Sequence, residues 1–187
     1  MISRRRFVGA AAGALLVLRP GVGRAQEGLF LKPEDAPRQL FPDLSDVSER
    51  VIAVTPALQA RIRELMGRSP SMWEPAYRTF TAKQGERVLG FTVVVEEIGK
   101  HRPITFAVAV NPDGTVRDVA VLAYREAYGG DIKERRFLKQ YAGKTGTAPL
   151  LPYRDIQNIA GATLSVEATG RAVKKAIAVL RATGDLG

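Results

Sequence analysis

Three apolar segments separated by turn signals constrain the fold of this chain more than any other feature. Between residues 88 and 96, apolar side chains alternate with their neighbours as they do in an extended strand. A Gly-Lys-His-Arg-Pro turn at 99–103 leads into a second apolar segment at 104–110. The sequence Asn-Pro-Asp-Gly at 111–114 then leads into a third, at 116–123. The pattern predicts an antiparallel β-meander.

The C-terminal part of the chain predicts an amphipathic helix over residues 165–182. Its apolar stripe comprises Val166, Val173, Ala176, Ile177 and Leu180. Two shorter helices are predicted at 55–67, where Thr55 and Pro56 give a start signal and Gly67 a stop signal, and at 132–141. Because strands and helices are segregated along the chain, the predicted fold class is α+β, with the meander packed against the C-terminal helix.

Composition excludes several classes of site. The chain has no cysteine, which rules out disulfides, thiolate zinc sites, cysteine-ligated iron–sulfur clusters and thioether-linked haem. His101 is the only histidine and lies in a turn, so a catalytic triad and a histidine metal site lack their parts, and we predict neither catalytic nor metal-binding residues. Any redox chemistry therefore needs an organic cofactor.

The first 25 residues have the architecture of an export signal. The sequence Ser-Arg-Arg-Arg-Phe at 3–7 precedes a mild apolar stretch that ends at Leu18, and a Gly-Arg-Ala segment ends at Ala25. This order resembles the twin-arginine signal, which implies export of the folded protein to the periplasm or cell envelope. An uncleaved membrane anchor is the alternative, but the apolar stretch is shorter than the ~20 residues that span a bilayer.

Removal of this segment changes the charge of the chain. The formal charge of +9 falls to +4 without the five arginines of residues 1–25. A modest positive charge suits a phosphate-bearing ligand or an anionic membrane surface, and we predict no nucleic-acid partner. Residues 26–44 contain three prolines among mixed charges and are expected to form an extended lead-in to a domain at 45–187.

Residues 155–165, Asp-Ile-Gln-Asn-Ile-Ala-Gly-Ala-Thr-Leu-Ser, lie between a loop and the start of the C-terminal helix. Unpaired backbone N–H groups and the positive end of the helix dipole favour an anion such as phosphate at this place. Gly161 and Ala162 leave the Thr163 hydroxyl accessible, and Ser165 is predicted to cap the helix. From spacing alone, a tight turn before a capped helix is the commoner interpretation.

This segment, together with Gly90-Phe91 and the sequence Tyr-Arg-Glu-Ala-Tyr-Gly-Gly at 124–130, resembles the FMN-binding domain family found in subunits of Rnf and sodium-translocating NADH:quinone reductase complexes. The resemblance covers about residues 45–182 and implies FMN as the cofactor. In that family a flavin transferase uses FAD to esterify the last threonine of a Ser/Thr-Gly-Ala-Thr segment to the FMN phosphate. The resemblance therefore implies Thr163 as the covalent acceptor.

The residues around the acceptor partly follow the family pattern. Gly161, Ala162, Leu164 and Ser165 surround Thr163 in the matching segment. Asp155 matches an acidic residue of the transferase signature, which implies a role in recognition by the transferase. Ala160 stands where the family often has serine or threonine, which removes one hydroxyl that could bond the phosphate or guide the transferase.

The family resemblance also implies that the segment after the third predicted strand contributes to the flavin pocket. Glu126 resembles the acidic residue of the family's Glu-Thr-Pro-Gly sequence, although Ala127 and Tyr128 replace Thr-Pro. Tyr124, Tyr128 and Leu164 are candidates for the wall beside the isoalloxazine ring, with plain core positions as the alternative for the tyrosines.

These features imply an exported flavoprotein whose phosphoester-bound FMN carries electrons in the cell envelope, more an electron-transfer protein than a stand-alone enzyme. Its expected partners are a flavin transferase for maturation and a membrane or periplasmic redox protein. Two alternatives stay open. One is a flavin-free accessory module that docks on a membrane redox complex through the basic segment 133–139, and the other is a small envelope flavin reductase.

Overall fold

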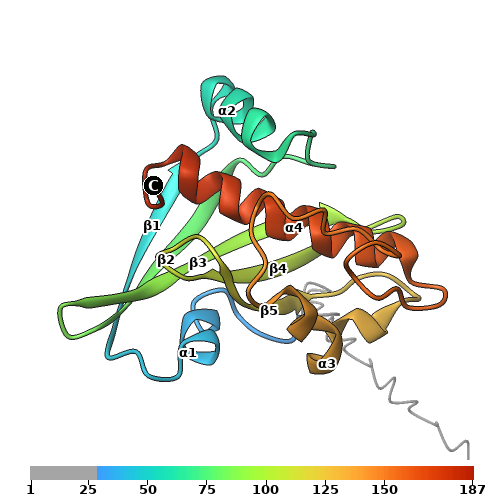
Figure 1. The fold of residues 1–187 in the computed structure, drawn as a ribbon, viewed down its shortest axis with the longest axis horizontal. Coiled ribbons are helices and arrows are strands. Elements are labelled where there is room, and N and C mark those ends of the chain that lie inside the picture. Colours follow the sequence, from blue (N-terminus) through green and yellow to red (C-terminus); the bar gives the residue numbers. More distant parts are fainter. Residues whose placement is uncertain (1–28) are drawn as a thin grey trace, which may run out of the picture.

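Each strand of the sheet pairs antiparallel with the strand that follows it in the chain. The computed structural model describes residues 29–187 (Figure 1), so the predicted export signal at 1–25 lies outside the described residues. The strands are β1 (Asp46–Ala53), β2 (Ala76–Gln84), β3 (Arg87–Ile98), β4 (Pro103–Val110) and β5 (Val116–Ala123). The predicted meander of β3, β4 and β5 is confirmed.

Strands β1 and β2, which extend the meander on its N-terminal side, were not predicted from the sequence. Nearly all of β1 is exposed, so the strand lacks the apolar alternation that signals a strand in a sequence. Its place is set instead by pairing with β2, for example Arg50 opposite Thr79. In β2 the buried Tyr77 and Phe80 follow directly after a proline-rich segment, which concealed the start of the strand.

One face of the sheet is covered by α4 (Thr163–Ala182), which runs diagonally across it (Figure 1). The main core lies between them, where Val93 and Val95 of β3 and Val108 of β4 pack with α4 residues such as Val173 and Ile177. This arrangement is the predicted packing of the meander against the C-terminal helix. Burial of these apolar side chains stabilises the fold at roughly 25 cal/mol per Å².

The predicted helix at 55–67 is confirmed as α2 (Pro56–Met66), which packs beside α4. The Thr55 hydroxyl accepts a hydrogen bond from the Leu58 N–H at 3.2 Å, and Gly67 ends the helix in the left-handed conformation. None of the helices within residues 29–187 has both the length and the apolar character that crossing a membrane requires.

The lead-in is not extended throughout, because it contains the short helix α1 (Ala36–Leu40). This helix covers the second face of the sheet, where Leu40 and Phe41 pack on alanines of β2, β4 and β5. Phe41 is completely buried, and its ring lies where a side chain on Gly90 would project, with Phe41 Cζ 2.8 Å from a Cβ placed there. The alanines and Gly90 give the aromatic ring the space it needs.

The predicted helix at 132–141 is broken into three short pieces. These are a 3₁₀ turn (Gly130–Lys133), α3 (Arg135–Leu138) and a second 3₁₀ turn (Lys139–Tyr141). The break lies at Glu134, whose backbone is extended with a ψ of 133°. The inward side chains of this segment, Phe137, Leu138 and Tyr141, are buried as expected.

Close packing of α4 on the loop before it gives a testable prediction at Gly170. A Cβ at this position would lie 2.1 Å from the Leu150 carbonyl oxygen. We expect Gly170→Ala to lower the free energy of unfolding by about 1–3 kcal/mol, the usual cost of an overpacked site. Urea denaturation followed by circular dichroism measures this. A gain of about 1 kcal/mol, which helix propensity alone would give, would contradict the close contact.

Candidate functional site

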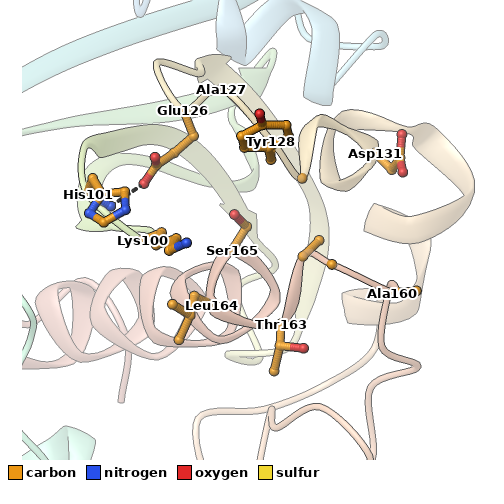
Figure 2. Close-up of a pocket in the computed structure, with 13 residues that line it drawn as sticks. Lys100, His101, Glu126, Ala127, Tyr128, Asp131, Ala160, Thr163, Leu164 and Ser165 are labelled. Carbon is orange, nitrogen blue, oxygen red and sulfur yellow. Dashed lines mark hydrogen bonds between the residues drawn. The ribbon is translucent and has the colours of Figure 1, made fainter.

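A cleft of about 690 Å³ opens where the first turn of α4 faces the β3–β4 turn and the segment after β5 (Figure 2). Residues 100–101, 126–129, 131 and 160–165 line it. The volume is in the range of small-molecule sites, which run from roughly 300 to 1,000 Å³. The antiparallel order explains this meeting, because the β3–β4 turn and the end of β5 lie at the same end of the sheet.

The cleft brings together most of the residues singled out in the sequence. Its lining includes Gly161, Ala162, Thr163, Leu164, Ser165, Glu126 and Tyr128. It does not include Asp155, whose carboxylate accepts a hydrogen bond from the Leu151 N–H at 3.0 Å and lies 3.2 Å from the Lys144 ammonium. Burial raises the pKa of Asp155, but these two donors outweigh it and hold the pKa below its usual range.

The floor of the cleft is the N-terminus of α4. The helix begins at Thr163, with Ala162 as the N-cap, and no side chain accepts a hydrogen bond at the cap. Gly161 precedes it in the left-handed conformation with a φ of 76°. The N–H groups of this first turn and the helix dipole therefore offer an anion site that no capping side chain occupies.

Ser165 does not cap the helix, which corrects the sequence-based expectation. The helix starts two residues earlier than predicted, so Ser165 lies within its first turn. Its hydroxyl is buried and lies 3.2 Å from the Tyr124 hydroxyl. The serine thus connects α4 to the segment after β5 and does not accept a hydrogen bond from a free N–H group at the start of the helix.

Tyr124 is buried behind the wall of the cleft and supports it through hydrogen bonds. Burial raises the pKa of Tyr124, so the phenol stays protonated and donates a hydrogen bond to the Tyr128 carbonyl oxygen. Gly129 follows with a φ of 81°, and a Cβ there would lie 3.0 Å from the Tyr124 hydroxyl and 3.1 Å from Ala162 Cβ. The segment is therefore packed directly against the first turn of α4, with Tyr124 as a core residue.

The exposed wall of the cleft is apolar and aromatic. Tyr128 is 83% exposed and Leu164 is 46% exposed, and both line the cleft. Large apolar side chains this exposed are candidates for ligand contact. Of the predicted wall residues, these two are thus in a position to meet a planar ring, whereas Tyr124 supports them.

Lys100 and His101 are cleft residues that were not predicted from the sequence. Both residues lie at the tip of the β3–β4 turn, where the Lys100 side chain extends toward the start of α4 and His101 lies beside Glu126 (Figure 2). Glu126 fixes this turn, because its carboxylate accepts hydrogen bonds from the backbone N–H groups of His101 at 2.5 Å and Arg102 at 2.9 Å. The only sequence signal for their position is the predicted strand order, which places the β3–β4 turn and the end of β5 at the same end of the sheet.

The hydrogen bonds of Glu126 predict a pH-dependent turn. Burial raises the pKa of Glu126, but the N–H groups of His101, Arg102 and Lys100 outweigh it and the pKa lies below its usual range. A folded pKa below the unfolded value of about 4.3 means that the stabilisation is complete above that value and is lost as pH falls through the folded pKa. We expect the His101 and Arg102 amide NMR signals to titrate together in that acid range.

The variant Glu126→Gln provides the control for this titration. It keeps an oxygen acceptor but removes the ionisable group, so the two amide signals should no longer titrate in the acid range. Signals that titrate equally in the variant would show that another group controls the turn.

Asn158 is a third residue that was not predicted from the sequence. Its side-chain Nδ2 donates a hydrogen bond to the Thr163 hydroxyl oxygen at 3.0 Å. Thr163 itself is partly buried and lines the cleft at the first helical position. No spacing rule in the sequence predicts this contact, because it depends on the shape of the loop before α4.

Comparison with known proteins identifies relatives of this chain. The sequence profile of the FMN-binding domain family matches residues 99–178, a shorter span than the resemblance noted in the sequence. One component of the proton-translocating ferredoxin:NAD(+) oxidoreductase complex of Clostridium ljungdahlii is 28% identical over 105 residues, which cover 52% of this chain. The match spans 57% of the length of that relative.

A solved structure supports the fold. The crystal structure of Shewanella oneidensis NqrC matches with a TM-score of 0.53 and 16% sequence identity, over 78% of this chain and 84% of that chain. At this identity the match concerns the fold alone. It agrees with the α+β class deduced from the sequence.

The cleft fits FMN on structural grounds. The first turn of α4 suits a phosphate, the faces of Tyr128 and Leu164 suit a flat apolar ring, and the threonine hydroxyl stands at the phosphate end. The family match runs from the β3–β4 turn through β5 to α4, and so contains every residue that lines the cleft. Residues 99–178 of this chain therefore belong to the FMN-binding domain family, and FMN is the cofactor.

Proposed function

We propose that this protein is an exported electron carrier whose FMN is attached through its phosphate to Thr163 Oγ1. The observation that carries the proposal is the place of Thr163, at the uncapped start of α4 and in the wall of the cleft. The match to a component of a ferredoxin:NAD(+) oxidoreductase complex supports the assignment to electron transfer. The partner is then a redox protein of the membrane or periplasm.

The chain supplies binding and orientation, and the bound flavin supplies one- and two-electron chemistry. Gly161 and Ala162 keep the approach to the α4 N–H groups open for the phosphate. Leu164 and Tyr128 contact the ring. Glu126 and Ser165 act indirectly. Glu126 fixes the β3–β4 turn, and Ser165 fixes the Tyr124 hydroxyl.

Attachment requires a flavin transferase and a flavin adenine dinucleotide. The Thr163 oxygen forms a bond to the phosphorus of the FMN half while the pyrophosphate bond breaks, so that adenosine monophosphate leaves and the hydroxyl proton passes to the transferase. Asp155 is proposed as a recognition residue for that enzyme. It lies on the loop before α4, where its two hydrogen-bonding partners fix the loop conformation.

Export and covalent attachment support one another. The arginine-rich leader at 1–25 favours export in the folded state by the twin-arginine pathway. A cofactor that dissociates outside the cytoplasm is lost, so a covalent bond keeps each molecule loaded. The proposed location is the periplasm or cell envelope.

The proposal is tested by coexpression of the chain with a flavin transferase. Flavin fluorescence that stays with the protein band in a denaturing gel supports the covalent carrier. A colourless, unmodified protein from a host with an active transferase would favour the flavin-free accessory module. Rapid turnover of small acceptors by the loaded protein alone would favour the flavin reductase.

A further inference from the structure

We infer that Asn158 and Tyr153 form a positioning pair that holds the Thr163 hydroxyl ready to accept FMN. The inference rests on the proposed function, because it assigns the geometry that makes this one hydroxyl a good acceptor. Both residues lie on the loop before α4, outside the lining of the cleft.

The first observation is the hydrogen bonding of the Asn158 amide. Its nitrogen donates to the Thr163 hydroxyl oxygen at 3.0 Å and to the Tyr153 hydroxyl oxygen at 2.6 Å, which uses both of its hydrogens. Its Oδ1 is buried and has no hydrogen-bond partner among the described residues. With the amide in this orientation, both hydroxyl oxygens accept a hydrogen from Asn158 and keep their own hydrogens available.

The second observation is the backbone of Tyr153. Its φ is 63°, a left-handed conformation that costs a residue other than glycine about 1–2 kcal/mol. Burial of the ring does not repay this cost, because Tyr153 is 80% exposed. The conformation instead brings the phenol oxygen to Asn158, while the Tyr153 N–H donates to the Ile156 carbonyl at 3.1 Å and closes the loop.

The third observation is where Thr163 lies in the helix. A threonine in a helix divides its side chain between two χ1 rotamers. A fixed donor 3.0 Å from Oγ1 selects one of them and leaves the hydroxyl hydrogen free to be given to a base. The same N–H group stays on the oxygen as negative charge develops there during attachment, where a fixed donor is most effective.

The decisive experiment compares FMN attachment to purified apoprotein by a flavin transferase with flavin adenine dinucleotide. The variant Asn158→Asp keeps the size of the side chain but replaces the donor by an acceptor at neutral pH. We expect kcat for the acceptor protein to fall about 10- to 100-fold, the effect of losing one hydrogen bond to a developing charge. KM should stay unchanged, because Asn158 acts on the hydroxyl.

A pH profile separates positioning from a merely structural role. When the carboxyl of N158D is protonated at lower pH it regains a donor, so its rate relative to the unmodified sequence should recover. Tyr153→Phe removes the phenol oxygen that holds the amide and should slow attachment by a smaller factor. Arg154→Ala is the matched control, since this exposed side chain of the same loop makes no hydrogen bond or ion pair among the described residues.

Different results would overturn the positioning pair and the covalent FMN carrier. If FMN is attached to Thr163 in the protein without substitutions, and to N158D with the same kcat, the positioning pair is overturned and the covalent carrier stands. If the protein without substitutions receives no FMN, or receives it on another residue, the positioning pair and the covalent attachment at Thr163 are both overturned. Melting temperatures of all variants check the fold, and Tyr153→Phe keeps the test valid if Asn158→Asp does not fold.

Discussion

Replacing Thr163 by valine is expected to abolish covalent FMN while the protein still folds. The two side chains have nearly the same shape, and the change removes only the hydroxyl. Thr163 is partly buried at the first position of α4, and its side chain makes one hydrogen bond, from Asn158. The free energy of unfolding should therefore fall by only about 0.5–1.5 kcal/mol. Intact mass and in-gel flavin fluorescence under denaturing conditions measure the loss of the cofactor.

Thr169→Val is the matched control for this experiment. Thr169 lies on the same helix, is fully buried, and donates a hydrogen bond to the Ser165 carbonyl at 2.8 Å. This variant loses a threonine hydroxyl too, but should keep its FMN. Covalent flavin in Thr163→Val, or its loss in Thr169→Val with the fold intact, would contradict Thr163 as the acceptor.

The largest effect on stability is expected at Lys175, a completely buried residue of α4. Its ammonium lies 2.9 Å from a Glu74 oxygen and 3.3 Å from a Glu97 oxygen, and donates to the carbonyls of Met72 and Glu96. Lys175→Ala leaves these carboxylates buried without their shared cation. We expect the free energy of unfolding to fall by about 3–5 kcal/mol, the usual cost of breaking a buried ion pair.

Chemical denaturation at two pH values checks this expectation. Burial raises the pKa of Glu74 even beside Lys175, and removal of the lysine raises it further. In the variant, stability should therefore fall as pH rises above the unfolded pKa and recover in part at acid pH, where the carboxyl is neutral in both states. Lys174→Ala, on the adjacent helix position, is the control. Equal losses in the two variants would contradict the buried cluster.

The parts of the fold that were predicted from sequence carry strong local signals. Strands β3, β4 and β5 alternate and are separated by turns with glycine and proline, and α2 has both a cap and a left-handed glycine. The elements that were missed depend on tertiary contacts. The edge strand β1 is specified by its partner, and α1 is stabilised by packing of Leu40 and Phe41 on the sheet.

The candidate site shows the same division between local sequence signals and tertiary contacts. The resemblance found the segment around Thr163, and glycine and alanine before a helix start are visible in a sequence. Lys100 and His101 enter the cleft only through the order of the strands. Asn158 contacts Thr163 through the shape of the loop before α4, in which Tyr153 takes a left-handed conformation that no local pattern of a tyrosine signals.

Peptide mapping of the exported, transferase-matured protein tests the central claim most directly. Trypsin cleaves after Arg154 and Arg171 and releases residues 155–171, which contain Thr163 together with Ser165 and Thr169 as other hydroxyl residues. We predict that this peptide carries the mass of one FMN less one water and that fragmentation places it on Thr163. A peptide recovered without FMN, or with FMN on another residue, would contradict the account.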